Sequence, residues 1–202
     1  MVSGQVPADD QLISLSKDGN LAAFNTLVER YQGPLFSLCV RLIGSREAAE
    51  DATQEAFLSV YRNLHRFEGG NVRSWLFRIA ANECKDELRR RSRKDLALSL
   101  DRPADDDHAA LDVADSAPGL QRLVEQSELA RAVHEAIAAL PEDQRLVILL
   151  VDLHGFDYHE VATITGAALG TVKSRVSRAR ARLREYFLAN PELVDAYRRL
   201  EK

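Results

Sequence analysis

Basic and hydroxyl side chains recur near the C-terminal end of the chain at a spacing suited to contacting DNA. The segment from Gly166 to Arg184 holds six basic residues and no acidic one, although the whole chain carries a net charge of −4. Wound as a helix, it presents seven candidate contact residues opposite or beside an apolar stripe. These are Thr171, Lys173, Ser174, Arg175, Arg178, Arg180 and Arg182. Such a face fits the major groove, where arginine and lysine meet guanine edges and small hydroxyl residues permit close approach.

Two helices joined by a glycine turn would position this face. Asp157, followed three residues later by Glu160, has the spacing of a capping box and begins a short helix. Gly166 supplies the turn that ends it, and a longer helix follows in which apolar residues recur at three- and four-residue steps. This order is typical of a helix-turn-helix. The alternative is a solvated basic helix end, favoured by the helix dipole, but it leaves the preceding capped helix and turn unexplained.

A second donor-rich face is expected on a helix over residues 72–91. Four of its polar residues recur at steps of four, three and four and form one stripe. These are Arg78, Asn82, Lys85 and Arg89. Side chains of these types can serve phosphates and unstacked bases. The preceding loop, with two glycines before Asn71, could approach nucleic acid closely because it lacks side-chain bulk. The alternative interpretation is a solvated, arginine-rich surface.

Polar and apolar side chains mix on the outer face of a helix expected over residues 45–64. Leu58 lies there among two carboxylates, an amide and a guanidinium, which belong to Asp51, Glu55, Gln54 and Arg62. A single exposed leucine is commonplace in folded proteins. An apolar residue ringed by polar groups is also typical of a partner-docking face. The residues alone leave both interpretations open.

The rest of the sequence predicts an all-α chain of two small helical domains. No alternating apolar pattern typical of strands persists, and glycine and proline fall between helical periods. One such break is expected at Gly33–Pro34, which would separate helices over residues 21–32 and 35–43. A further short helix is expected after Asn190.

A flexible acidic linker is expected between the two domains. This stretch holds two prolines, a triple aspartate and few apolar residues, a composition that disfavours a packed core. The predicted boundaries are 1–95 for the first domain, 96–124 for the linker and 125–202 for the second domain. Since the linker is acidic and the candidate DNA faces are basic, the two could pair within one chain.

Membrane, secreted and enzymatic classes are disfavoured by motifs that the sequence lacks. Its longest apolar run, Leu146–Val151, is too short to span a bilayer, and no signal-peptide pattern is visible, so a cytoplasmic location without membrane insertion is expected. Cys39 and Cys84 are expected to be core thiols in a reducing compartment. The five histidines show no metal-ligand pairing, and no phosphate loop or nucleophile motif is found. We therefore assign no catalytic residue, no metal and no cofactor.

Three stretches together resemble one family, the extracytoplasmic-function (ECF) group of bacterial RNA polymerase sigma factors. They are DATQEAFLSVYRNL at Asp51–Leu64, RSWLFRIAANECKDELRRRSR at Arg73–Arg93, and LPEDQRLVILLVDLHGFDYHEVATITGAALGTVKSRVSRARARLR at Leu140–Arg184. The three occur in the family's order, with a variable linker between the last two. The resemblance implies an alternative sigma factor, which is not an enzyme, with RNA polymerase core and promoter DNA as partners.

The resemblance also implies roles for the candidate residues. The helix that holds Leu58 would dock on the clamp coiled coil of the polymerase β′ subunit, and the β flap would be a further contact. The loop and helix over residues 65–89 would open and read the −10 element, with Asn82 a contact to an unstacked base. The helix over residues 170–184 would read the −35 element as duplex. An anti-sigma factor, often membrane-anchored, would hold the chain inactive at the inner membrane face, and the active chain would lie at the nucleoid.

A stand-alone helix-turn-helix regulator is the alternative function. Such a protein would bind DNA as a dimer without polymerase, and its helix-turn-helix would look the same. It would need a dimer interface and a ligand pocket, and it would leave the mixed face around Leu58 without a purpose.

Overall fold

The computed structural model describes residues 7–98 and 120–193, and all the secondary structure in these residues is helical. Side-chain surroundings are described for residues 7–93 and 129–193. The N-terminal half contains α1 (Asp9–Lys17), α2 (Leu21–Ile43), α3 (Arg46–Asn63), a 3₁₀ turn η1 (Leu64–Arg66) and α4 (Val72–Leu98). The C-terminal half contains α5 (Leu120–Ala138), α6 (Glu142–Ile148), a π-helical turn η2 (Leu149–Leu153), α7 (Tyr158–Thr165) and α8 (Leu169–Ala189). The predicted all-α fold of two helical units is confirmed.

The described helices extend into both ends of the predicted linker. Helix α4 continues to Leu98, and α5 begins at Leu120. Residues 99–119, which make up most of that linker, and residues 194–202, which hold most of the short helix expected after Asn190, lie outside the described residues. None of the described helices is both long enough and apolar enough to cross a membrane.

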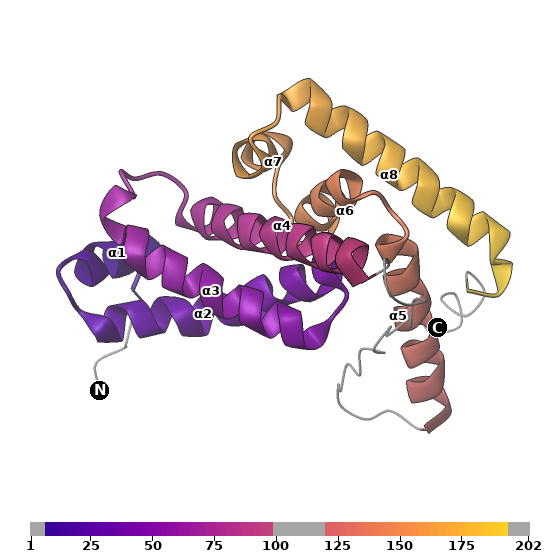
Figure 1. Cartoon of the computed structure of the whole chain (residues 1–202), viewed down its shortest axis with the longest axis horizontal. Coiled ribbons are helices and arrows are strands. Elements are labelled where there is room, and N and C mark those ends of the chain that lie inside the picture. Colours follow the sequence, from indigo (N-terminus) through magenta and orange to yellow (C-terminus); the bar gives the residue numbers. More distant parts are fainter. Residues whose placement is uncertain (1–6, 99–119, 194–202) are drawn as a thin grey trace.

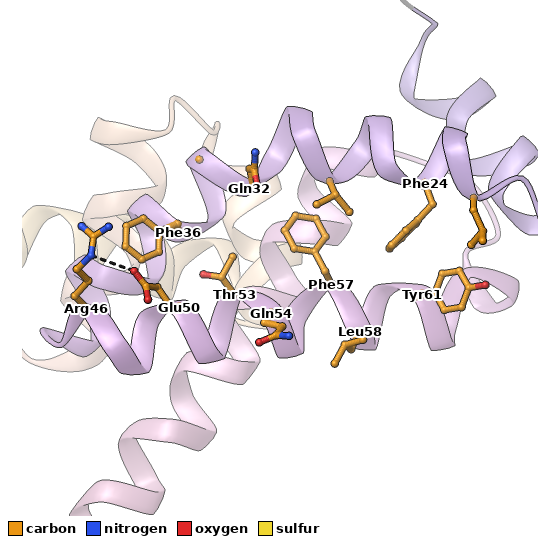
Figure 2. A pocket seen from close by; sticks show the side chains of 13 residues that line it. Phe24, Gln32, Phe36, Arg46, Glu50, Thr53, Gln54, Phe57, Leu58 and Tyr61 are labelled. Carbon is orange, nitrogen blue, oxygen red and sulfur yellow. Dashed lines mark ion pairs between the residues drawn. The ribbon is translucent and has the colours of Figure 1, made fainter. Parts of the chain in front are cut away.

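The core of the N-terminal half forms where α2, α3 and α4 pack together. The inward face of α3 carries alanines, of which Ala49 and Ala56 are completely buried, and their small side chains let the neighbouring helices approach closely. Long side chains such as Leu35 and Leu76 fill the space from α2 and α4. Away from this core, α2 and α3 leave an open groove between their outer faces (Figure 2).

The predicted break at Gly33–Pro34 is wrong, because α2 runs through both residues. Proline lacks the N–H that would bond to the carbonyl of Arg30, and it costs a helix interior about 3 kcal/mol. The same helix buries Leu35 and Leu38 completely on its inner face. Burial stabilises each such leucine by about 1.5–3 kcal/mol, so tertiary packing offsets the local penalty.

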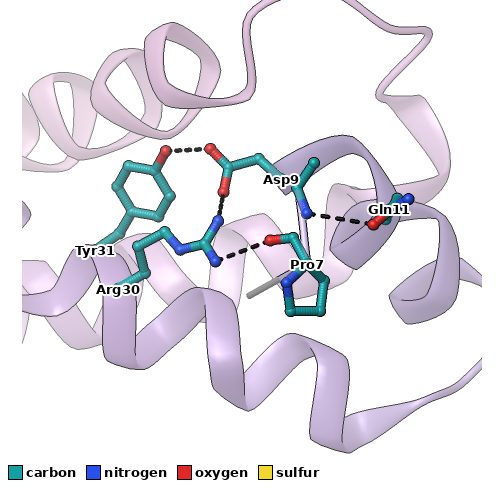
Figure 3. A network of polar contacts seen from close by, with 6 residues as sticks. Pro7, Asp9, Gln11, Arg30 and Tyr31 are labelled. Carbon is teal, nitrogen blue, oxygen red and sulfur yellow. Dashed lines mark hydrogen bonds and ion pairs between the residues drawn. The ribbon is translucent and has the colours of Figure 1, made fainter. Parts of the chain in front are cut away.

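A polar network fastens α1 to α2 (Figure 3). The carboxylate of Asp9 accepts hydrogen bonds from the guanidinium of Arg30 and the hydroxyl of Tyr31, and Arg30 also donates to the carbonyl of Pro7 over 2.9 Å. Burial, together with the hydrogen bond to Asp9, raises the pKa of Tyr31 above its usual range, so its proton stays available for that bond.

The core of the C-terminal half lies between α6, α7 and α8. The nearly all-apolar segment from Leu146 to Leu150 is buried, and it contacts the inner faces of α7 and α8 through residues such as Val161 and Val176. Because this core is small, it fixes α8 along one edge only and leaves the opposite face of that helix exposed (Figure 1).

The two halves pack against each other. Helix α7 lies against α4, and α5 and α6 contact α2 (Figure 1). Arg145 on α6 donates one hydrogen bond across this boundary, to the carbonyl of Leu42 at the end of α2 over 2.8 Å. The groove between α2 and α3 and the outer face of α8 stay open in this arrangement.

Candidate nucleic-acid and protein interfaces

The capping box predicted at the start of α7 is confirmed. The carboxylate of Asp157 accepts hydrogen bonds from the backbone N–H groups of His159 and Glu160, both over 2.8 Å, and Glu160 accepts from the N–H of Asp157 over 2.9 Å. Gly166 ends α7 with φ at +68°, a conformation that favours glycine. The helix-turn-helix is therefore set by local capping at its start and by a glycine at its turn.

Helix α8 separates an apolar face from a basic face as the spacing predicts. Val172, Val176 and Ala179 are buried against the C-terminal core. Five of the seven candidate −35 residues are exposed, and they are Lys173, Ser174, Arg178, Arg180 and Arg182. Thr171 and Arg175 are half-buried on the flank. This face is accessible to a duplex without rearrangement of the C-terminal half.

Two of the candidate −35 arginines already have carboxylate partners. Arg175 pairs with Asp143 over 2.8 Å, and Arg180 donates two hydrogen bonds to Asp152, over 3.2 and 2.6 Å. Sequence spacing within α8 could not show these pairs, since Asp143 lies on α6 and Asp152 on η2. Ion pairs that water reaches contribute at most about 1 kcal/mol, so a phosphate could replace the carboxylate.

The candidate −10 residues lie along α4 and the loop before it. Arg78, Asn82 and Arg89 are exposed, Lys85 is half-buried, and Arg89 donates a hydrogen bond to Asp86 over 3.1 Å. They form one polar stripe on the same helix, as the spacing predicts.

Asn71, the fifth candidate, differs from the other four because both the oxygen and the nitrogen of its side-chain amide form hydrogen bonds within the chain. Its oxygen accepts from the N–H of Ser74 over 3.0 Å and caps α4, while its amide nitrogen donates to Glu160 of α7 over 2.8 Å. This candidate therefore lies at the contact between the two halves of the chain.

The candidate docking face borders the groove between α2 and α3 (Figure 2). The groove has a volume of about 820 Å³, and Gln54 and Leu58 line it. Asp51, Glu55 and Arg62 lie on the exposed side of α3 but do not line the groove, and Arg62 is 3.9 Å from Glu55. The structure thus places two of the five candidates in a concave apolar site and the other three on the exposed side of the same helix.

Sequence reasoning missed the aromatic lining of this groove. Phe24, Phe36, Phe57 and Tyr61 contribute to it, and the side chain of Phe24 meets Tyr61 edge-on at 5.0 Å between ring centres. The signal was a second apolar stripe on α2, in which Leu21, Phe24 and Val28 recur at three- and four-residue steps. Their spacing alone did not distinguish core positions from a docking surface.

Aromatic and cationic side chains meet at the boundary between the halves. The guanidinium of Arg73 lies 4.1 Å from the ring centre of Phe156 and donates a hydrogen bond to the carbonyl of His154. Phe77 meets the rings of both Phe156 and His154 edge-on at 4.8 Å. Burial, followed by the positive charges of Arg73 and Arg41, lowers the pKa of His154 from 6.5 to about 4.

As the pH falls from 7 toward 4, we expect the wild-type chain to lose more stability than a His154→Gln variant. His154 stays neutral in the folded chain, whereas the unfolded chain binds a proton there below pH 6.5. The unfolded state is therefore favoured progressively as the pH falls through this window, and the loss levels off below about 4. Thermal unfolding at a series of pH values measures the difference, and parallel midpoints for the two proteins would contradict it.

The described residues give no sign of a metal centre. No group of three or more histidine, cysteine, aspartate or glutamate side chains among them could hold an ion. Cys39 and Cys84 are both fully buried in the N-terminal core as free thiols. A hydrogen bond with Cys39, followed by burial, raises the pKa of Cys84 above its usual range, so this group is a thiol rather than a thiolate.

Each half of the chain matches a known protein family. Residues 27–94 match the Sigma-70 region 2 family and residues 130–183 match Sigma-70, region 4. The RNA polymerase sigma-H factor of Pseudomonas aeruginosa is 35% identical over 177 residues, which cover 85% of this chain and 90% of that protein. The ECF RNA polymerase sigma-E factor of Escherichia coli is 35% identical over 173 residues, with the same coverage of 85% and 90%.

Two solved structures share the fold across both halves. The sigma factor RpoE of Bartonella quintana, in complex with the anti-sigma factor NepR, has a TM-score of 0.67 and 29% identity and covers 81% of this chain and 96% of its own. CnrH, in complex with the cytosolic domain of CnrY, has a TM-score of 0.65 and 27% identity, with coverage of 91% and 99%.

Proposed function

Because the chain belongs to the ECF group of RNA polymerase sigma factors, we propose that its two halves divide promoter recognition between them. As an alternative sigma factor it binds RNA polymerase and promoter DNA in transcription initiation, a role that belongs to a binding factor rather than an enzyme. Residues 1–95 dock on the polymerase core and recognise the −10 element, and residues 125–202 recognise the −35 element. The active chain accordingly acts at the nucleoid in the cytoplasm.

The groove between α2 and α3 is the proposed docking site for the clamp coiled coil of the β′ subunit. The observation that carries this assignment is its concave shape together with an aromatic lining and the exposed Leu58. A helix that places apolar side chains in such a groove gains affinity from their burial. The polar residues Asp51, Glu55 and Arg62 lie beside the groove, where they can orient the partner through charge. The β flap is the proposed partner of the C-terminal half.

The two basic faces are the proposed DNA contacts. The exposed face of α8 enters the major groove of the −35 element, and the exposed side chains of Lys173 and Arg178 contact base edges there. The stripe on α4 contacts the −10 element, and the exposed amide of Asn82 bonds an unstacked base.

An anti-sigma factor is the proposed regulator. The related sigma factor of Bartonella quintana was solved in complex with an anti-sigma factor, and its fold covers both halves of this chain. A regulator anchored in the inner membrane would hold the chain at that membrane's cytoplasmic face until release.

Co-elution with purified bacterial core polymerase, followed by run-off transcription from a promoter library, tests the proposed function. We expect stable co-elution and initiation from a defined pair of −35 and −10 elements. Failure to bind core, with sequence-specific binding to duplex retained, would instead support a stand-alone regulator.

Replacing Lys173 or Arg178 with alanine is expected to weaken binding to the matched −35 duplex by about 1–3 kcal/mol, because each would lose a base-edge contact. The loss should be much smaller on a duplex with the contacted base changed. Arg182→Ala is the matched control, since a phosphate contact weakens binding to all sequences alike and reduces its salt dependence. Binding isotherms on both duplexes at several salt concentrations measure these effects. Equal losses for all three variants on both duplexes would contradict the base-reading assignment.

A further inference from the structure

The loop that precedes α4 is held at both ends and exposed in its middle. At its start, Phe67 is buried and its ring lies 4.9 Å from that of Trp75 on α4, measured between ring centres. At its end, the side-chain oxygen of Asn71 accepts from the N–H of Ser74 over 3.0 Å. Residues 68–70 between these points are exposed, and the two glycines among them have φ of +110° and +101°. Because glycine restricts the backbone least, the path of the loop depends on how its two ends are fixed.

Lys17, the last residue of α1, fixes the start of this loop. Its ammonium group donates to the carbonyl of Phe67 over 2.5 Å and lies 5.8 Å from the centre of the Phe67 ring, to whose face a cation is attracted. The contact thus holds the peptide group from which the loop departs. The two residues are 50 positions apart, so no periodicity in the sequence relates them.

Helix α1 is itself anchored, so its end is a fixed point from which Lys17 can act. Leu12 and Ile13 are buried in the N-terminal core. At the opposite end of the helix, Asp9 accepts hydrogen bonds from Arg30 and Tyr31 of α2 (Figure 3). The bond from Lys17 therefore ties the loop to the core of the N-terminal half.

We propose that Lys17 is a positioning residue for recognition of the −10 element. It holds the loop over residues 67–71 in the conformation that receives the unstacked base, and it acts through Phe67, because its ammonium group is already bonded to that carbonyl. The inference rests on the proposed function and deepens it, since it extends −10 recognition to α1, which holds none of the candidate DNA contacts. A released loop samples other conformations, and the apparent affinity falls with the fraction that stays competent.

The test is the affinity of the holoenzyme, core polymerase with the full-length chain, for a labelled single strand that carries the −10 element identified by run-off transcription. Lys17→Met keeps an unbranched apolar stem and removes the ammonium group, and we expect binding to become about fivefold weaker. Lys17→Arg keeps a donor for the carbonyl and should restore the wild-type affinity. Fluorescence anisotropy measures each protein.

Arg30→Met is the matched control. It removes the same positive charge and releases the opposite end of α1, since Arg30 donates to Asp9 and to the carbonyl of Pro7. It does not touch the loop, so it should bind the single strand as the wild type does. An equal loss in Arg30→Met would show a general loosening of α1 or a charge effect and would overturn the inference.

The salt dependence of binding separates positioning from direct contact with DNA. If Lys17 met a phosphate, its replacement by methionine would reduce the slope of log affinity against log salt concentration by about 1. Positioning lowers the affinity and leaves that slope unchanged. A reduced slope in Lys17→Met would therefore overturn the assignment of Lys17 as a positioning residue.

Trp75 reports on the loop without any DNA, because it is the only tryptophan in the sequence and Phe67 packs against it. In the free chain we expect its fluorescence emission to shift to longer wavelength in Lys17→Met, since water reaches the ring when the loop is released. The emission should stay unchanged in Lys17→Arg and Arg30→Met, and circular dichroism checks that all three variants keep their helix content. Unshifted emission or wild-type strand affinity in Lys17→Met would contradict the inference.

Run-off transcription with the wild-type chain distinguishes failure of this inference from failure of the proposed function. If the wild type initiates from a defined promoter and Lys17→Met matches it in every assay, the proposed function is retained and the inference alone is wrong. A wild-type chain that neither binds core nor initiates would overturn both.

Discussion

Replacing Leu58 with glutamate is expected to abolish binding to the polymerase core while leaving the fold intact. The side chain is 40% exposed on the rim of an apolar groove, so a carboxylate there remains hydrated in the free chain. On docking it would lose water without gaining a partner, at a cost of about 3 kcal/mol or more. This cost corresponds to a loss of affinity of about 100-fold or more.

Leu15→Glu provides the matched control for this experiment. Leu15 lies on α1, is 44% exposed and does not line the groove. The same change in charge and hydrophobicity there should leave core binding unaltered. Co-elution and titration with labelled core measure both variants, and circular dichroism checks their helix content. Core affinity at the wild-type level for Leu58→Glu would show that the groove is not the docking site.

Arg145→Ala should lower the free energy of unfolding by about 3 kcal/mol, since each buried carbonyl left without a donor costs about 1–3 kcal/mol. Its guanidinium donates to the carbonyls of Leu42 at 2.8 Å and Leu140 at 3.0 Å, and also to that of Ala138. These oxygens lie at or just beyond the ends of α2 and α5, where helices leave carbonyls without an internal partner. The positive charge also favours the dipoles of both helix ends.

Arg131→Ala is the comparison for this measurement. Arg131 is an exposed arginine on α5 that pairs with the carboxylate of Glu135 over 3.8 Å, so its loss should change stability by less than about 0.5 kcal/mol. Denaturant unfolding of both variants gives the two values. Similar midpoints would show that solvent satisfies the three carbonyls when Arg145 is removed.

The features that sequence predicted correctly are those set by near neighbours in the chain. The capping box of Asp157 and Glu160, the turn at Gly166 and the apolar stripe of α8 each depend on residues within a few positions. The same reasoning was wrong at Pro34, where burial of distant side chains outweighs the local preference of proline.

Contacts between segments far apart in the chain could not be predicted. Asn71 and Glu160 are 89 positions apart, and Arg73 and His154 are 81 apart, so no periodicity relates them. The aromatic groove escaped detection because Phe24 has the spacing of a core residue while its partner Tyr61 lies on another helix. The charge segregation raised the idea of basic residues pairing with the linker. Most of the linker lies outside the described residues, so that idea stays a prediction, and within the described part Arg175 and Arg180 pair with Asp143 and Asp152.

The π-helical turn η2, between α6 and α7, determines the direction in which its last residues point. The N–H of His154 bonds to the carbonyl of Leu149, five residues back, so this turn accommodates one residue more than an α-helical turn. A regular α-helix over the same residues would present its last residues out of phase with this turn, by up to about 100° for the one extra residue. Asp152 would then turn away from Arg180, and the carbonyl of His154 from Arg73. The length of this segment is therefore constrained more tightly than its composition, and insertions and deletions are costlier here than substitutions.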